Sequence, residues 1–212
     1  MNLFDAHSIV ADLGLAGVLA IIFAETGLLI GLAFPGDSLL FIAGVAASGS
    51  GAALLGNAHL PAGALFLLAP LAALLGGHVG YFFGYKYGRK IFDRPDGRVF
   101  NHQRVLATDK WLRKYGTGKA LIFARFIPFV RTLINPMAGV VGLDKKKFFI
   151  FNAVGAILWT EVVIGLGFIL GEKLKGSVDA YLLPIIGVIV LASLVPVLLE
   201  IFREWQTRKH HK

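Results

Sequence analysis

Apolar residues along the chain are gathered into six long stretches, separated by shorter polar or charged segments. These stretches are residues 13–33, 38–56, 60–85, 120–142, 148–170 and 180–202. Each has close to the ~20 residues that a helix needs to cross the hydrocarbon core of a bilayer. The pattern therefore predicts an all-α integral membrane protein, built as a single membrane domain over residues 1–212.

Composition supports the same class. Hydrophobic residues make up 56% of the chain, charged residues only 16%, and the mean hydropathy is +0.72. Soluble domains are about 45–50% apolar with glycine included and about 25% charged. A chain of 212 residues cannot bury so much apolar surface in its own core, so its solvent must be lipid. The absence of cysteine excludes disulfides, thiolate chemistry and cysteine-based metal sites.

The positive charges are confined to segments beside the apolar stretches. No lysine or arginine precedes Lys86, and ten basic residues then fall within 86–119. This distribution follows the positive-inside rule for cytoplasmic loops and argues against a nucleic-acid partner. We expect 86–119 to be a basic, amphipathic cytoplasmic connector and 203–212 to be a basic cytoplasmic tail. The first stretch lacks a basic n-region and a cleavage motif, so we expect it to belong to the mature protein.

The two cytoplasmic segments set a parity condition on the stretches between them. Three stretches lie between 86–119 and the tail, so one of them must enter and leave on the same side. The stretch 120–142 is the best candidate, because it carries Arg125 and Arg131 around a break at Pro128. An arginine at membrane depth costs roughly 2.5–3.5 kcal/mol on the insertion scale. We therefore expect a re-entrant hairpin at 120–142.

Three other stretches are expected to cross the membrane as uninterrupted helices. They are residues 60–85, 148–170 and 180–202. Parity counted back from Lys86 places the N-terminus outside.

The first half contains a similar interruption. Glu25 and Asp37 lie in apolar surroundings, and Pro35 and Gly36 form a turn signal just before the aspartate. We interpret 13–48 as a second re-entrant hairpin that enters from the opposite face. Two broken hairpins in corresponding halves are typical of inverted-repeat transporters with a site at the midplane.

The two hairpins are expected to meet, because irregular backbone is tolerated at membrane depth only inside protein or beside water. This would place Glu25 and Asp37 near Arg125 and Arg131, with a formal charge of zero. Arginine suits phosphate or carboxylate, and a buried carboxyl group can take up a proton near neutral pH. The functional interpretation is an anion site with proton coupling. The alternative is two salt bridges that hold the hairpins together.

Small and aromatic residues mark two further helix faces. Gly76, Gly80, Gly84 and Gly88 recur every four residues, which predicts close helix packing or a sliding surface for a moving hairpin. Asn152, Gly155 and Trp159 share one face of the 148–170 helix. We expect this face to pack against the arginine hairpin, with the Asn152 amide bonding freed carbonyl groups.

Two more ionisable residues lie in apolar stretches. His78 is expected to be a packing residue, with a proton relay as the alternative. Glu161 lies roughly opposite Asn152 on its helix, since nine residues turn about 900°. It can pair with Arg125 or Arg131, or bridge to a second subunit of a homo-oligomer, and the sequence leaves these options open.

No motif indicates an enzyme. The six histidines form no metal-binding spacing, and neither a G-x-S-x-G sequence nor a P-loop is present. A membrane phosphatase would need a nucleophile beside its basic residues, and none is evident. We therefore expect no catalytic residues, no metal and no cofactor.

These motifs, in this order, resemble the DedA family of integral membrane proteins, whose shared module is the VTT or SNARE-associated domain. The resemblance extends from about residue 20 to 170. It consists of Glu25 with FPGD at 34–37, the glycine–tyrosine run 76–88 and FARFIPFVR at 123–131, followed by Ala138, Gly139, Phe148, Asn152, Gly155 and Trp159. The first motif often ends in glutamate where this chain has Asp37, which keeps the acid. Glu161 matches no motif of the family.

The resemblance implies two facing re-entrant hairpins and lipid translocation that depends on the proton-motive force. Bacterial members are associated with returning undecaprenyl phosphate to the cytoplasmic face, and eukaryotic relatives scramble phospholipids. We expect a multi-pass protein of the bacterial cytoplasmic membrane, with the C-terminus in the cytoplasm because of its basic tail.

The leading hypothesis is a flippase of polyprenyl phosphate. Arg125 and Arg131 would bind the phosphate, and Glu25 and Asp37 would exchange protons. Pro35, Gly36, Pro128, Asn152 and Trp159 would support the site. The alternatives are a proton-coupled carrier of small solutes, a non-transporting protein that organises membrane enzymes through its glycine faces, and a membrane phosphatase.

Overall fold

The computed structural model describes residues 6–27, 36–54, 59–92, 112 and 115–173, and no strand occurs in these ranges. The helices are α1 (Ala6–Gly27), α2 (Gly36–Ala47), α3 (Gly51–Leu54), α4 (Ala62–Phe92), α6 (Thr117–Ala124), α7 (Pro128–Val140) and α8 (Lys145–Lys173). The predicted all-α class is confirmed for this part of the chain. The predicted span 180–202, the tail 203–212 and most of the connector 86–119 lie outside the described residues.

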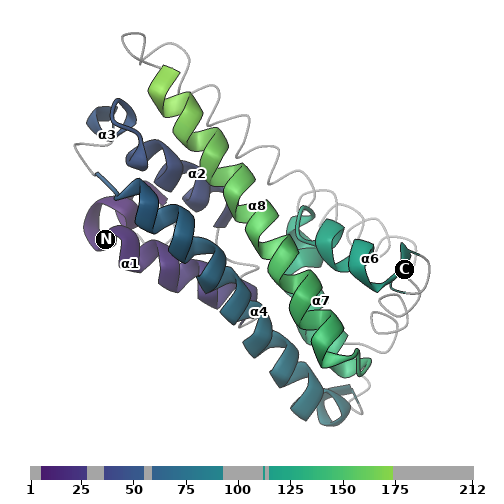
Figure 1. Cartoon of the computed structure of the whole chain (residues 1–212). Helices are drawn as coiled ribbons and strands as arrows, with labels where there is room; N and C mark the ends of the chain where they lie inside the picture. The colour runs from purple at the N-terminus through teal and green to yellow at the C-terminus, as the bar shows by residue number, and fades with distance from the viewer. Residues whose placement is uncertain (1–5, 28–35, 55–58, 93–111, 113–114, 174–212) are drawn as a thin grey trace, which may run out of the picture.

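Two of these helices are long and apolar enough to cross a membrane. They are Ala62–Gly88 of α4, with a mean hydropathy of 1.8, and α8, with a mean hydropathy of 2.1. The first covers all but two residues of the predicted span 60–85, and the second contains the predicted span 148–170. They run in opposite directions side by side (Figure 1), because Phe66 packs on Phe168 near one end while His78 packs on Phe148 toward the other.

The two interrupted stretches each give a pair of helices. The first pair is α1 and α2, and the second is α6 and α7. Within α1, Gly14 takes a left-handed φ of 57°, which breaks the helix close to the predicted start of the first hairpin. Residues 28–35, between α1 and α2, lie outside the described part of the chain. The chain is therefore divided into helical pairs at the places where charged residues and prolines interrupt the apolar pattern.

Glycines bring α4 into backbone contact with a helix of each pair. A Cβ atom on Gly76 would stand 2.5 Å from the carbonyl oxygen of Phe23 in α1, and one on Gly84 would overlap the carbonyl of Pro136 in α7. The packing interpretation of the glycine ladder is confirmed at these positions. α4 therefore packs against both helical pairs and links them.

The α2–α8 interface is built in the same way. Gly44 of α2 approaches the Ile164 carbonyl, and Gly167 of α8 approaches the Phe41 carbonyl. Apolar side chains from α1, α2, α4 and α8 form one core cluster, and those from α6 and α7 form a second with Tyr81 and Phe148.

We expect Gly167→Leu to destabilise the protein, because a side chain there must push α2 and α8 apart. Overpacking costs about 1–3 kcal/mol, which lowers the melting temperature by roughly 2–12 °C in a domain of this size. Gly165→Leu is the matched control, since a Cβ atom there meets nothing within 4 Å. Thermal unfolding in detergent measures both, and equal melting temperatures would contradict the assignment.

A short turn joins α7 to α8. The Leu143 amide donates to the Ala138 carbonyl at 3.0 Å, while Gly142 takes a φ of 68°, which closes α7 in a Schellman motif. Asp144 then caps α8, because its Oδ1 accepts from the Lys147 amide at 2.9 Å. The second helical pair is thereby fixed to the start of the second span.

Candidate functional site

The break between α6 and α7 places two arginines on opposite sides of a turn. Arg125 is the C-cap of α6, and Pro128 is the first residue of α7. Ile127 between them is extended, with φ −109° and ψ 107°, as expected for a residue that precedes proline. Arg131 follows in the first turn of α7. A proline after a short helix therefore allows the two side chains to take separate environments.

Arg131 is bound by two carboxylates from the first helical pair. Its Nη2 donates to Oε1 of Glu25 at 2.5 Å, and its Nη1 donates to Oδ1 of Asp37 at 2.6 Å. Arg131 and Glu25 are 3% and 2% exposed, and Asp37 is 20% exposed. Each contact is a charge-assisted hydrogen bond, which is stronger than a bond between neutral groups. We call Glu25, Asp37 and Arg131 the triad.

Trp159 of α8 completes the surroundings of the triad. Its Nε1 donates to Oδ1 of Asp37 at 2.8 Å, and its ring lies under the guanidinium, with Arg131 Cζ 4.2 Å from the ring centroid. The indole therefore contacts both charges at once, through a hydrogen bond to the acid and a cation–π interaction with the base. The triad itself joins α1, α2 and α7, and Trp159 adds α8 as a fourth helix.

Arg125 has no carboxylate partner among the described residues. It is 1% exposed, and its Nη2 donates to Oδ1 of Asn152 at 2.5 Å and to the Ala73 carbonyl at 3.4 Å. Its partners are neutral dipoles, so its positive charge is not balanced by direct contact. A buried charge that is solvated only by dipoles is costly to keep.

The four charges are therefore divided unevenly. With both acids ionised, the triad carries a formal charge of −1, and Arg125 carries +1 beside it. The sequence predicted that the four groups meet with a total charge of zero. The structure brings Glu25 and Asp37 to Arg131 and leaves Arg125 with Asn152.

Glycines make room for these side chains. A Cβ atom on Gly77 would lie 2.8 Å from the Asn152 amide nitrogen and 3.0 Å from Nη2 of Arg125, and one on Gly155 would lie 3.0 Å from Cδ of Arg125. A Cβ atom on Gly36 would overlap the Glu25 carboxylate. Gly36 was predicted as part of a turn, and the structure adds this steric reason for glycine there.

The other predicted residues are placed as follows. The Asn152 amide donates to a backbone carbonyl, as predicted, at 3.3 Å. That carbonyl is the one of Leu74 in α4, whereas a carbonyl of the arginine hairpin was expected. His78 lies beside Asn152, with Nδ1 3.4 Å from the Asn152 amide nitrogen and 2.9 Å from the Leu74 carbonyl. Pro35 lies outside the described residues, and of Pro128 only the backbone is described.

Glu161 does not join the site. It is partly exposed on α8, and neither arginine pairs with it in the described part of the chain. The option of a pair with Arg125 or Arg131 is therefore not realised there. A bridge to a second subunit remains a prediction.

Two contributors were not singled out from the sequence. Asn135 donates to the Thr26 carbonyl at 3.0 Å and so ties α7 to the end of α1. Gly77 directly follows Gly76 and does not fit the four-residue spacing of the glycine ladder. The available signal for Asn135 was a polar amide side chain within an apolar stretch. Nothing in the spacing distinguished Gly77.

Removing the indole donor alone should weaken the triad. We expect Trp159→Phe to keep the ring under Arg131 but to cost about 1–3 kcal/mol, because Asp37 loses a charge-assisted hydrogen bond. Trp159→Leu loses the ring contact as well and should be less stable still. Thermal unfolding of the three proteins tests this order, and a wild-type melting temperature for Trp159→Phe would be the contrary result.

A known protein-family model matches the part of the chain that carries most of the site. A model of the VTT domain matches residues 34–169, a range that contains Asp37, both arginines, Asn152 and Trp159. No group of three or more histidine, cysteine or acidic side chains able to hold a metal ion occurs among the described residues. No solved structure gives a significant match.

Several curated relatives cover most of the chain. Protein DedA of Escherichia coli (strain K12) is 35% identical over 204 residues, which are 94% of this chain and 89% of that protein. An uncharacterized membrane protein of Mycobacterium tuberculosis (strain H37Rv) is 34% identical over 99% of this chain and 88% of its own length. Inner membrane protein YqjA of Escherichia coli (strain K12) is 34% identical over 72% of this chain and 65% of its own length. The chain is therefore a membrane protein that belongs to the DedA family, the family of the VTT domain.

Proposed function

We propose that this protein is a proton-coupled transporter of an anionic membrane lipid, with polyprenyl phosphate as the substrate. The observation that carries the proposal is the uneven division of charge at the site. A triad of formal charge −1 lies near a buried arginine whose described partners are neutral dipoles. Intramembrane ionisable groups of this kind are functional by default.

Unpartnered atoms support both halves of the proposal. Among the described residues, Oε2 of Glu25 and Nη1 of Arg125 are buried without a hydrogen-bond partner. A carboxylate oxygen in that state can accept a proton without breaking an existing hydrogen bond. A guanidinium N–H in that state can donate to a phosphate oxygen, which is the ligand that its planar geometry fits.

The charges link proton uptake by the triad to anion binding at Arg125. Protonation of one acid changes the triad from −1 to 0 and leaves the charge of Arg125 in excess. Negative charge of a phosphate that enters beside Arg125 offsets this excess in a region where net charge is expensive. One proton therefore accompanies one negative charge of the substrate, so a proton gradient can drive the anion.

The packing of the helices supports an inverted repeat with opposed re-entrant hairpins. Exchanging α1 with α6, α2 with α7 and α4 with α8 turns the α1–α4 contact into the α6–α8 contact, and the α2–α8 contact into the α7–α4 contact. Glycines occur at all four interfaces: Gly76, Gly155, Gly167 and Gly84. The acids then come from one half and the bases from the other, so a movement of one half relative to the other changes their contacts. Repeats of this kind provide alternating access.

A lipid substrate fits the surroundings of the site better than a small solute. The outer faces of α4 and α8 are apolar and exposed, for example at Leu67, Leu71, Ile157 and Leu166. A polyprenyl phosphate could place its phosphate at Arg125 while its tail stays in lipid along these faces. The named relatives support a membrane location, and we place the protein in the bacterial cytoplasmic membrane with the connector and the C-terminus inside.

The test is lipid movement in liposomes that contain the purified full-length protein. A labelled polyprenyl phosphate is followed from one leaflet to the other with and without an imposed pH gradient. We expect the gradient to accelerate flipping by wild type, and Glu25→Gln and Asp37→Asn to remove the acceleration. Absence of flipping by well-folded wild type would overturn the lipid assignment, and gradient-driven uptake of a small anion would then favour a solute carrier.

A further inference from the structure

An open cavity of about 910 Å³ lies between the second half of α4 and the start of α8, away from the triad. Its walls are mainly aromatic: His78, Phe82 and Phe83 come from α4, and Phe148 and Phe149 from α8. The volume is near the upper end of the 300–1,000 Å³ that is typical of ligand sites. Phe82, Phe83 and Phe149 are about half exposed, so the walls are apolar surfaces that the described helices leave uncovered.

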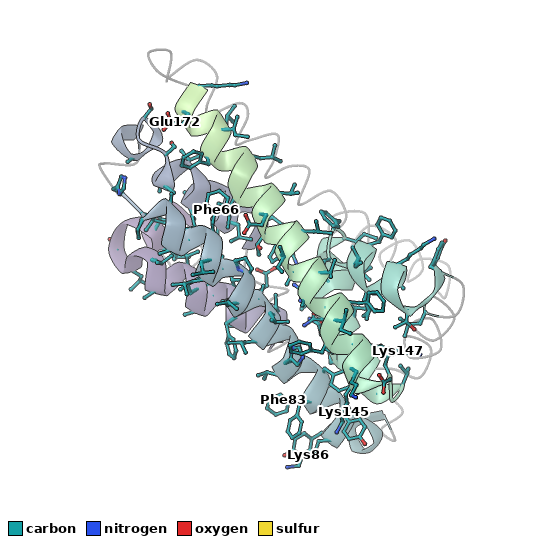
Figure 2. The ribbon with its side chains drawn as sticks, viewed as in Figure 1. Phe66, Phe83, Lys86, Lys145, Lys147 and Glu172 are labelled. Carbon is teal, nitrogen blue, oxygen red and sulfur yellow. The ribbon has the colours of Figure 1, made fainter. Side chains whose placement is uncertain are left out.

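Four lysines lie at or near one end of this cavity. Lys145 and Lys146 line it directly, Lys147 follows them, and Lys86 rests on the Phe82 ring at 5.7 Å. Figure 2 shows Phe83, Lys86, Lys145 and Lys147 together at the same end of the molecule, far from Phe66 and Glu172. The cavity is therefore apolar along its walls and positive at one end.

Among the described residues, these lysines have little acidic compensation. Lys145, Lys146 and Lys147 form the first turn of α8, which contains no acidic residue. A helix N-terminus already carries a partial positive charge, so three cations there repel it. Asp144 caps the helix with its carboxylate but is one charge against four. A bound anion would reduce the repulsion among these lysines and the helix N-terminus.

We propose that this cavity binds an anionic phospholipid of the surrounding bilayer, with its phosphate at Lys145 and Lys146 and one acyl chain along the aromatic walls. The amphipathic shape of the site matches such a molecule: basic pockets between membrane helices bind anionic headgroups, and the apolar walls take the chain. This lipid is a resident ligand and is distinct from the transported substrate.

One wall of the cavity also reaches the charged site. His78 lies 4.7 Å, centroid to centroid, from the Phe149 ring, and its Nδ1 is 3.4 Å from the Asn152 amide nitrogen. Asn152 in turn accepts from Arg125. The resident lipid therefore contacts the side chain that orients the partner of Arg125, which gives bilayer composition a route to the transport site.

The test places a tryptophan in the cavity and a quencher on the lipid chain. Full-length Phe149→Trp protein is reconstituted in nanodiscs that contain increasing fractions of phosphatidylglycerol or phosphatidylcholine with brominated acyl chains. Leu166→Trp is the matched probe, because Leu166 lies on the same helix and is 59% exposed outside the cavity. Wild type corrects for the three natural tryptophans.

We expect phosphatidylglycerol to quench Phe149→Trp at much lower mole fraction than phosphatidylcholine, whereas Leu166→Trp should show no preference. The substitutions Lys145→Gln and Lys146→Gln should each weaken the preference for phosphatidylglycerol by roughly fivefold. Lys173→Gln, at the other end of α8, should leave it unchanged.

Three results would overturn the proposal. The first is equal quenching of Phe149→Trp by both lipids, and the second is a preference that survives the double lysine substitution. The third is protection of Phe149→Trp from both lipids, which would show that protein, such as residues 180–202 or a second copy of the chain, fills the cavity. Each result is read without any transport assay, so it is independent of the proposed function.

Discussion

Arg125→Gln is expected to abolish transport while leaving the protein as stable as wild type. The variant removes the one buried charge that lacks a carboxylate partner in the described part of the chain. The hydrogen bond to Asn152 is lost, but so is the cost of burying a charge among dipoles, and these effects are opposite in sign. If Arg125 binds the phosphate, losing its charged donor should reduce the transport rate on the order of 10²-fold or more.

Transport in liposomes and thermal unfolding in detergent measure the two effects separately. We expect the melting temperature of Arg125→Gln to stay within about 3 °C of wild type, which corresponds to roughly 1 kcal/mol. Wild-type transport would contradict the assignment of the phosphate to Arg125. A large loss of stability would show that Arg125 holds the fold together.

Arg131→Gln is expected to behave in the opposite way, with a large loss of stability. Glu25 and Asp37 would be left close together without their shared cation. Removing one partner of a buried ion pair costs about 3–5 kcal/mol, which lowers the melting temperature by roughly 6–20 °C. Transport should be lost as well, because the proton-accepting acids lose their defined geometry.

A second substitution separates this explanation from general damage. In Arg131→Gln/Glu25→Gln one of the two uncompensated carboxylates is gone, so a substantial part of the lost stability should return, without transport. Absence of rescue in the double variant would mean that Arg131 acts through packing against Trp159 and not through its charge.

The membrane class and the identity of the four central charges could be predicted from the sequence. Charged residues are rare in these stretches, so Glu25, Asp37, Arg125 and Arg131 stood out against an apolar background. Pro128 marked the break between α6 and α7 because proline restricts the residue before it. The glycine ladder on α4 predicted close packing for the same local reason, since small residues let helices approach.

The pairing of those charges could not be predicted. Sequence spacing does not specify which arginine reaches the acids, because α1, α2 and α7 meet only through tertiary packing. The two arginines are six residues apart, yet the extended backbone at Ile127 sends them to different partners. Asn152 was expected to serve the hairpin backbone, but its position opposite Ala73 and Leu74 of α4 makes it the partner of Arg125.

The same limit applies to the resident-lipid cavity. In the sequence, Lys86 stood out only as the first residue of the basic connector, and Lys145–Lys147 only as charges just before an apolar stretch. Their position around one aromatic cavity depends on α4 and α8 running in opposite directions, which brings residues about 60 positions apart to the same end (Figure 2).

The central claim is that proton uptake by the triad permits an anion to bind at Arg125. The most direct test is the affinity of purified protein for a short-chain polyprenyl phosphate between pH 6.5 and 8.5, a range above the second phosphate pKa of about 6. The account predicts that wild type binds more tightly as the pH falls, and that Glu25→Gln binds tightly across the whole range because its triad is already neutral. An affinity that does not change with pH in wild type, or that changes equally in Glu25→Gln, would contradict it.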